Sequence, residues 1–373
     1  MSSKVSVVSC TDYEPETVKQ ALHTALTLIG GLSSVLHSEQ RILLKPNLVS
    51  SAKREQAVAT DPAVMRALIQ LLKEDGFCNI SAGDSGSFHS KTNLTAQACG
   101  LDEVLQEENI PLCLFEEGTP TPLPDGNPMM IANEVLNCDA LISVCKMKTH
   151  ALERITGAVK NQYGCVSGMH KTMGHTRYPN AESFAHMLIQ LNRLVAPKLY
   201  IMDGVLAMEG NGPTSGDPIP MRVLLASTDP IALDTVFCHL VYLDPKLVPT
   251  NIAGQRLKLG TYEDIEIVTP DGTVSAAELQ QKYGNPNFRV DRKQQRTKGI
   301  LDLVGMVKLF QRRPYIDASL CRKCGVCTQC CPVEGKAVHF KNGKDKPPVY
   351  QYRKCIRCYC CQEMCPYHAI KVK

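Results

Sequence analysis

The sequence predicts an α/β protein, with a largely parallel sheet flanked by helices, followed by a small α+β unit at the C-terminus. The first observation is that short apolar runs alternate with helical patterns from the start of the chain to about residue 270, which is typical of strand–helix–strand units. The second is a cysteine pattern that occurs twice within the last 53 residues. The length of 373 residues suits two domains, or one large domain with an appendage.

The elements of the first part can be assigned in chain order. Seven apolar runs are expected to be strands: Val5–Val8, Arg41–Leu44, Phe77–Ala82, Ala140–Val144, Lys198–Met202, Met221–Ala226 and Ile265–Val268. Five segments with helical spacing are expected to be helices: Glu14–Ile29, Pro62–Glu74, Leu94–Gln106, Ala181–Val195 and Pro230–Leu240. Asp61 and Asp229 each precede a proline, which is the pattern of an N-cap followed by a proline at the first helical position.

Composition places the domain boundaries. Residues 1–298 form the predicted α/β domain, and its last segment, Gly284–Lys298, is polar and is interpreted as a linker or surface loop. Residues 299–311 have apolar side chains at helical spacing and predict a connecting helix that docks the tail on the main body. Residues 312–373 form an internal repeat, in which each half has a cysteine loop followed by an extended piece.

The repeated cysteine pattern is C-x2-C-x2-C-x3-C-P. This run binds [4Fe–4S] clusters in bacterial ferredoxins, where the fourth cysteine of each run ligates the other cluster. The predicted ligands are Cys321, Cys324, Cys327 and Cys365 for cluster 1, and Cys355, Cys358, Cys361 and Cys331 for cluster 2. A pair of zinc sites usually shows paired C-x2-C motifs instead, so two [4Fe–4S] clusters are the better prediction. No ligand position is missing, which disfavours a [3Fe–4S] form.

Two further cysteines of the tail, Cys330 and Cys360, are not needed by this pattern. Each is adjacent to a predicted ligand, so they are interpreted as bystanders, with substitution for the neighbouring ligand left open. Ten of the 18 cysteines lie between residues 321 and 365, and the other eight are scattered. That distribution indicates a metal site together with reduced thiols rather than disulfides.

The expected compartment is a reducing one. No apolar stretch approaches the roughly 18 residues that a membrane span needs. The start of the chain lacks a basic segment followed by an apolar one, which a secretory signal would show. We therefore expect a cytoplasmic protein, in keeping with oxygen-labile clusters in an anaerobic cell.

Charge is distributed unevenly along the chain. Residues 310–373 carry 13 Lys and Arg against four Asp and Glu, whereas the remainder holds 28 against 33. Two oxidised clusters with eight thiolates lower the charge of the tail from +9 to about +5. A basic tail of this kind can dock on an acidic electron carrier of the ferredoxin or flavodoxin type, or on the acidic N-terminal part. No nucleic-acid motif accompanies it.

Polar residues follow five of the predicted strands, at Lys45–Asn47, Gly83–Ser85, Cys145–His150, Asp203–Gly204 and Ser227–Asp229. Because the carboxyl ends of parallel strands share one edge of a sheet, we expect these residues to converge on a cleft. Two glycine-containing segments add candidates. Gly157–Cys165 contains Lys160 and Asn161, and Glu209–Gly216 matches no nucleotide-binding motif.

A further metal site is left open for four residues, although their spacing fits no ligand signature: His150, His175, Cys145 and Cys165. The alternative is a structural role, as buried thiols and hydrogen-bonded histidines. No flavin motif is present in the sequence, which does not exclude a flavin.

At these residues the chain resembles the DUF362 family. The similar stretches are Leu43–Val49, Gly83–Ser85, Lys146–His150, Gly157–Cys165 and Asp203–Pro213, and they span roughly residues 40 to 240. Many members of that family carry a two-cluster ferredoxin tail, which the C-terminal part resembles at every ligand position. The resemblance implies an architecture and a set of positions, but no reaction. The segment Val333–Lys354 between the two cysteine runs, and the basic charge, depart from compact acidic ferredoxins.

The favoured function is an oxidoreductase in which two [4Fe–4S] clusters pass low-potential electrons to an anionic substrate or second cofactor in the α/β cleft. The expected catalytic residues are Lys148, His150, Lys160, Asp203 and Glu209. The expected substrate-binding residues are Lys45, Asn47, Asp84, Asn161 and Asn211. The alternative is an electron-transfer or accessory protein that docks a redox partner and catalyses no reaction itself.

Overall fold

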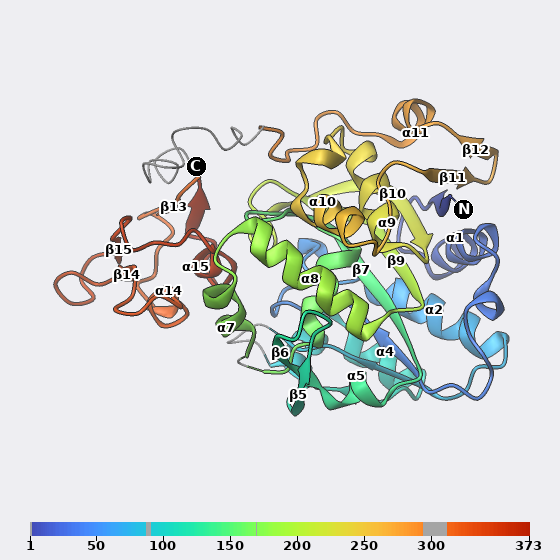
Figure 1. The fold of residues 1–373 in the computed structure, drawn as a ribbon, viewed down its shortest axis with the longest axis horizontal. Helices are drawn as coiled ribbons and strands as arrows, with labels where there is room; N and C mark the ends of the chain where they lie inside the picture. Colours follow the sequence, from blue (N-terminus) through green and yellow to red (C-terminus); the bar gives the residue numbers. More distant parts are fainter. Residues whose placement is uncertain (1, 87–90, 169, 294–311) are drawn as a thin grey trace.

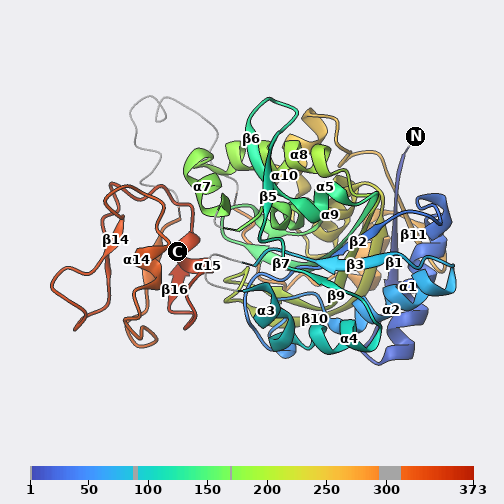
Figure 2. The ribbon, with the colours of Figure 1, turned by 90° about the horizontal axis from the view of Figure 1, so that it is seen from below.

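The computed structural model describes residues 2–86, 91–168, 170–293 and 312–373. Its main body is a ten-stranded sheet between two layers of helices, and the cysteine-rich tail forms a separate lobe at one end (Figures 1 and 2). The predicted α/β class is confirmed, because the sheet is largely parallel. The expected connecting helix at residues 299–311 lies outside the described residues.

The sheet has the strand order β12-β11-β1-β10-β9-β7-β2-β3-β4, with β8 paired to β7. Strands β4, β3, β2, β7 and β9 are parallel neighbours, β10 runs antiparallel to both β9 and β1, and β11 runs parallel to β1. The bounds are β1 Ser3–Ser9, β2 Ile42–Lys45, β3 Ile80–Gly83, β4 Leu112–Cys113, β7 Ala140–His150, β8 Arg154–Thr156, β9 Leu199–Glu209, β10 Asp217–Ser227, β11 Ile265–Thr269 and β12 Gly272–Val274.

Helices cover both faces of the sheet (Figure 2). The first face carries α1 Pro15–Leu28, α2 Pro62–Glu74, α3 Thr92–Cys99 and α4 Leu101–Glu107. The second carries α5 Asn133–Asn137, α6 Ala158–Asn161, α8 Ala181–Val195, α9 Pro230–Leu240, α10 Pro249–Arg256 and α11 Ala276–Tyr283. The hairpin of β5 Gly118–Pro122 and β6 Pro128–Ala132 adds to this side, and α7 His170–Arg177 lies beside the tail (Figure 1).

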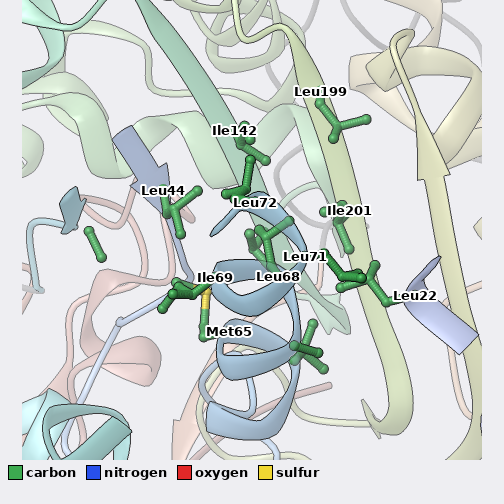
Figure 3. Close-up of a cluster of buried hydrophobic side chains, with 14 of the residues drawn as sticks. Leu22, Leu44, Met65, Leu68, Ile69, Leu71, Leu72, Ile142, Leu199 and Ile201 are labelled. Atoms are coloured by element: carbon green, nitrogen blue, oxygen red, sulfur yellow. The ribbon is translucent and has the colours of Figure 1, made fainter. Parts of the chain in front are cut away.

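Alternation along the strands builds the core. Leu44, Ile142 and Ile201 point to the first face and meet Leu68 and Leu72 of α2 (Figure 3). All five are fully buried, and each such side chain contributes about 1.5–3 kcal/mol relative to an exposed one. The alternate residues of the same strands face the helices of the other layer, so that both faces of the sheet are buried.

The structure corrects several predicted elements. The helix expected at Leu94–Gln106 is two helices, because Gly100 adopts the left-handed conformation (φ 81°) and ends α3. Strand β3 begins at Ile80 rather than at Phe77. Within the supposed linker, Phe288 is fully buried in the core beneath the second helical layer.

Strand β10 carries the correction that matters most for the site. The sequence placed its end, Ser227–Asp229, at the same edge as the other polar strand ends. Because β10 runs antiparallel to β9, that end lies at the opposite edge of the sheet. Asp229 caps α9 there by accepting the N–H groups of Ile231 and Ala232.

The tail is built from short pieces that surround its cysteines. Strand β13 pairs with β16 and β14 pairs with β15, both antiparallel. The bounds are β13 Pro314–Ile316, α14 Val326–Gln329, β14 Val338–His339, β15 Val349–Tyr350, α15 Cys360–Glu363 and β16 Ile370–Val372. Helix α15 faces the main body, and the β14–β15 loop projects from the far end of the lobe (Figure 1).

Candidate functional site

Strand β7 carries three polar side chains on one face at its carboxyl end. Lys146, Lys148 and His150 alternate with Met147 and Thr149, and all three are almost fully buried. The sequence predicted a loop here, but β7 continues to His150 because β8 pairs with it, with Lys148 opposite Thr156. The period of two in a strand then places the three polar side chains on the same side of the sheet.

The buried lysines differ in their partners. Lys45 forms an ion pair with Asp84 at 2.9 Å, and Lys146 forms one with Asp203 at 2.7 Å. Lys148 instead donates to two neutral oxygens, Asn47 Oδ1 and the Val58 carbonyl, each at 2.7 Å. Burial lowers the pKa of Lys148 to about 7, and the nearby charges of Lys160 and Lys146 contribute to this shift.

A cavity opens beside Lys148, between the strand ends and the tail. The volume of this cavity is about 100 Å³. One wall belongs to the α/β domain and consists of Asn47, Val49, Asp84, Ser85, Lys148, Thr156, Lys160, Asn161, Tyr163, Gly164, Lys171, His175 and Pro213. The other belongs to the tail and consists of Cys330, Cys360, Glu363 and Met364.

The side chain of Asn161 links two other residues beside this cavity through hydrogen bonds. Its Oδ1 accepts from Asn47 Nδ2 at 3.0 Å, and its Nδ2 donates to Ser143 Oγ at 3.0 Å. Gly164 lies against the ion pair of Lys45 and Asp84. A Cβ at this position would come within 2.0 Å of Asp84 Oδ1 and 2.5 Å of Lys45 Nζ. This glycine therefore makes room for the ion pair.

Lys160 reaches the cavity from α6, whose start is held by a side chain of α9. Asp234 accepts the N–H of Ala158 at 2.6 Å and that of Val159 at 3.2 Å. A Cβ at Gly157 would lie 2.0 Å from Asp234 Oδ1, so only glycine permits this approach. Lys160 Nζ lies 6.0 Å from the centroid of the Phe184 ring and has no hydrogen-bond or ion-pair partner among the described residues.

The charge of Lys160 affects six titratable groups in its neighbourhood. Burial is the largest influence on the surrounding titratable groups, and the ammonium of Lys160 then lowers the pKa of each of them. These groups are Lys148, His150, Glu153, Lys171, His175 and Glu363. An anion next to Lys160 would offset this excess of positive charge.

His150 joins the two domains. Its Nδ1 accepts the backbone N–H groups of Leu152 and Glu153, both at 3.1 Å. The proton of the neutral ring therefore sits on Nε2, which lies 2.7 Å from Glu363 Oε1 of the tail. Burial lowers the pKa of His150 to about 4, helped by the charge of Lys160, so the ring is neutral at pH 7.

Three buried polar atoms of the cavity wall have no hydrogen-bond partner among the described residues: Thr156 Oγ1, His175 Nδ1 and Glu363 Oε1. Glu363 Oε1 is paired with His150 Nε2, which leaves Thr156 Oγ1 and His175 Nδ1. The His175 ring is held in place by stacking on Phe184, with ring centroids 4.6 Å apart. Buried polar atoms normally have partners, so these two are available to a bound molecule.

The ten candidate residues of the α/β part separate into three groups. Five line the cavity: Asn47, Asp84, Lys148, Lys160 and Asn161. Lys45 and His150 lie directly behind it, in contact with lining residues. Asp203, Glu209 and Asn211 lie outside its lining.

The last three have other contacts. Asp203 accepts from Lys146, from the Tyr13 hydroxyl at 2.8 Å and from the backbone of Asp61. Glu209 binds Arg289. Asn211 donates to the Ile370 carbonyl of the tail at 3.0 Å, so the glycine-rich loop that contains it serves to dock the tail.

Sequence reasoning missed several wall residues. Thr156, Lys171 and the tail residue Glu363 were not candidates, and His175 was considered only as a metal ligand. Cys330 and Cys360 were recognised as left over, but nothing in their spacing indicates that both face the body. No local signal could reveal Glu363, because its role depends on how the tail docks.

The predicted ligands of cluster 1 surround a second, smaller cavity. Cys321, Cys324, Cys327 and Cys365 all line it, whereas Cys331 does not. Burial raises the pKa of Cys327 to about 12, and the charges of the other three thiols contribute. Four convergent thiols suit an inorganic cluster, whose positive irons would compensate the thiolates.

The predicted ligands of cluster 2 are buried as a group: Cys331, Cys355, Cys358 and Cys361. Burial raises the pKa of the Cys355 thiol, with the charges of Cys358 and Cys331 adding to the effect. Cys331 is thus close enough to influence the second cysteine run, and its assignment to cluster 2 stays a prediction. Both groups of four thiols fit [4Fe–4S] clusters.

The further metal site left open for His150, His175, Cys145 and Cys165 does not assemble. Among the described residues, these four side chains belong to no group that could hold a single metal ion. Within the same residues, no helix is long and apolar enough to cross a membrane.

Comparison with known families agrees with this architecture. The family model described as a domain of unknown function, DUF362, matches residues 42–239, which is more than half of the chain. A model described as a 4Fe-4S dicluster domain matches residues 313–366. The tail is therefore an iron–sulfur domain of the ferredoxin type.

Similar proteins carry varied names. The thylakoid-associated protein sll1697 of Synechocystis sp. is 36% identical over 261 residues, which are 69% of this chain and 81% of that protein. One subunit of the H(2):CoB-CoM heterodisulfide,ferredoxin reductase of Methanothermobacter thermautotrophicus is 27% identical over 151 residues, which are 37% of this chain and 18% of that polypeptide. The lactate racemase apoprotein from Thermoanaerobacterium thermosaccharolyticum aligns with a TM-score of 0.43 and 13% identity, over 63% of this chain and 56% of that one.

Proposed function

The chain belongs to the DUF362 family, and we propose that it is an iron–sulfur oxidoreductase that delivers low-potential electrons to an anionic substrate or second cofactor in the cavity between its domains. One observation carries the proposal. The cavity has polar strand-end residues on one wall and two cysteines that neighbour cluster ligands, Cys330 and Cys360, on the other. A molecule bound there would touch both the iron–sulfur domain and the groups able to bind and protonate it.

The clusters would be held by the two groups of four cysteines described above, and they supply one-electron transfer. Two of them match the pair of electrons that most reductions of small molecules require. The residues of the α/β domain then have the tasks of binding, orienting and protonating the acceptor.

Charge supports an anionic acceptor. Lys148, Lys160 and Lys171 line the cavity, against the carboxylates of Asp84 and Glu363. Asp84 is already neutralised by Lys45. The lining therefore has an excess of positive charge, and a carboxylate or phosphate at Lys160 would relieve it.

Lys148 is suited to proton transfer. Its pKa of about 7 allows the amine to exist in both protonation states near neutral pH. Thr156 and His175 offer a hydroxyl and a ring nitrogen to the same bound molecule. His150 is a positioning residue in this scheme, because it lies behind the cavity wall with its Nε2 only 2.7 Å from Glu363 Oε1.

A cavity between the domains favours an enzyme over a carrier or accessory protein that only docks a partner, for which a flat strand-end surface would be enough. The electron donor would be a soluble acidic carrier of the ferredoxin or flavodoxin type, since the tail is basic. We place this exchange in the reducing cytoplasm of an anaerobic cell, because the cysteines of the described residues are unpaired thiols.

The test is the reoxidation of reduced, anaerobic holoprotein by small anionic acceptors, followed by visible absorbance. The probes are fumarate, pyruvate, nitrite and sulfite. At least one should reoxidise the native protein, and Lys160→Met should slow this by about tenfold or more, which corresponds to 1.4 kcal/mol. Lys198→Met removes an exposed lysine just before β9 and should have no effect. No reoxidation by any probe, or equal rates in all three proteins, would contradict the enzyme and favour the accessory protein.

A further inference from the structure

The two groups of cysteines differ in their exposure. Of the cluster 1 ligands, Cys324 is exposed, and Cys321 and Cys365 are partly exposed. The cluster 2 ligands are all at most 8% exposed. The tail therefore has an outer and an inner cysteine group.

Residues adjacent to the inner group face the body. Cys360 and Glu363 of α15, together with Cys330, line the cavity between the domains. Gln362 fastens the same helix by donating to the carbonyls of Asn211 and Gly212 at 2.8 and 3.2 Å. Figure 1 shows α15 turned toward the body. The outer group is thus the one available to another protein.

Apolar side chains surround the outer group. Tyr367 is 44% exposed and lines the small cavity formed by the outer cysteines. Leu320, 40% exposed, directly precedes Cys321, and Val349, 43% exposed, follows Pro348 of the cavity wall. Single exposed apolar residues are ordinary, but several beside one site indicate an interaction surface.

Basic side chains form the rim of this apolar surface. The exposed cations are Arg322, Lys323, Lys341, Lys344 and Lys346. The loop that carries the last three is tied to the cysteine loop, because Lys323 Nζ donates to the Asp345 carbonyl at 2.8 Å. Asp345 is the one acidic residue of that loop. The surface therefore has an apolar centre and a positive rim, the usual composition of a steered docking site.

We propose that this outer surface docks a small acidic protein that carries an exposed one-electron cofactor. The inference rests on the electron donor of the proposed function and locates its binding site. Each encounter oxidises the carrier by one electron and reduces the tail by one, so two encounters supply the pair used at the cavity. The basic rim steers the carrier, and Tyr367 and Leu320 make the close contact next to the outer cysteines.

The test uses the full-length holoprotein and, as a probe, a purified acidic bacterial ferredoxin with two [4Fe–4S] clusters. Binding is measured by calorimetry at low and high salt, and electron transfer from the reduced probe is measured by stopped-flow absorbance. Lys344→Glu/Lys346→Glu should slow association by about tenfold or more, and added salt should slow the native protein similarly. Tyr367→Ser should weaken binding with little effect on the salt dependence.

Matched controls separate this surface from net charge and from catalysis. Lys198→Glu/Lys246→Glu makes the same charge change at exposed sites of the body and should leave association unchanged. Reduction by dithionite should be the same in every variant. Equal effects of the two charge-reversal pairs, salt-independent binding, or no binding of the probe would each overturn the proposal. No substrate is needed, so these outcomes are independent of what the cavity binds.

Discussion

At the level of single residues, the site is built from buried charges that depend on one another. Lys45 is fully buried, and its ion-pair partner Asp84 is 2% exposed. Asp84 also accepts the N–H groups of Leu48 at 2.7 Å and Ser85 at 2.8 Å. Removal of the lysine would leave this carboxylate buried without its counter-charge.

We therefore expect Lys45→Met to lower the free energy of unfolding by about 3 kcal/mol, the lower end of the range for a broken buried pair, because Asp84 keeps two N–H donors. The double variant Lys45→Met/Asp84→Asn should recover most of that loss. Urea unfolding of the three proteins measures both quantities. A double variant no more stable than the single one would show that the charge of Asp84 is not the cause.

Glu153 gives a prediction about pH. Both carboxylate oxygens of this fully buried residue have no hydrogen-bond partner among the described residues, and burial raises its pKa to about 8 from an ordinary value of 4.5. Between these two values the folded protein keeps a proton that the unfolded chain releases. This group therefore makes stability fall as pH rises through the window.

Glu153→Gln removes this titration. Its stability relative to the native protein should increase steadily between about pH 5 and 8, reaching a few kcal/mol. Lys148, whose pKa is lowered to about 7, makes stability rise with pH above that value. This effect is present in both proteins and cancels in the comparison. Urea midpoints at several pH values measure the difference, and Glu103→Gln, at an exposed position, serves as the control. A difference that does not vary with pH would refute the shifted pKa.

Residue types alone predicted much of the floor of the site. Lys148, Asn47 and Asn161 were identified because they follow strands or accompany glycines, and all line the cavity. The same reasoning selected Asp203, which instead pairs with Lys146. A strand end brings polar residues to an edge, but the choice between facing a cavity and facing another charge depends on packing that no linear pattern encodes.

At the level of elements, hydrophobic periodicity located most strands and helices, since burial sets that pattern. It could not give the direction of β10, which resembles a parallel strand in sequence and runs antiparallel in the sheet. It also ended β7 six residues too early, because Lys146, Lys148 and His150 look like a loop until β8 pairs with them.

The direction of β10 makes a testable distinction. Asp229 caps α9 at the edge away from the cavity, and it also accepts from Ser3 Oγ at 2.6 Å and from the N–H of Thr261 at 3.0 Å. We expect Asp229→Ala to cost about 1–2 kcal/mol of stability, while Asp229→Asn, which can still cap, costs less. Neither should alter acceptor reduction in the native state. Loss of activity at full stability in either variant would place Asp229 in the site after all.

At the level of the whole molecule, the proposed function depends on how the tail docks. Gln362 is fully buried between the domains and donates to two carbonyls of the glycine-rich loop. Gln362→Ala would leave these carbonyls buried and unpaired, which costs about 1–3 kcal/mol. We expect faster hydrogen exchange in residues 209–216 and in α15.

Gln329→Ala, at an exposed position of α14, is the matched control and should leave exchange unchanged. Iron content must remain constant in both variants, because Gln362 directly follows a predicted ligand. Unchanged exchange in Gln362→Ala would mean that other contacts hold the domains together.

The central claim is that an anion binds beside Lys160 between the two domains. Anomalous diffraction from anaerobic holoprotein crystals soaked in bromide tests it without knowledge of the natural acceptor. Our account predicts a bromide within about 4 Å of Lys160 Nζ, the range of a direct ion contact, in native crystals but not in Lys160→Met crystals. A cavity without bromide in native crystals, or one with the same occupancy in the variant, would contradict it.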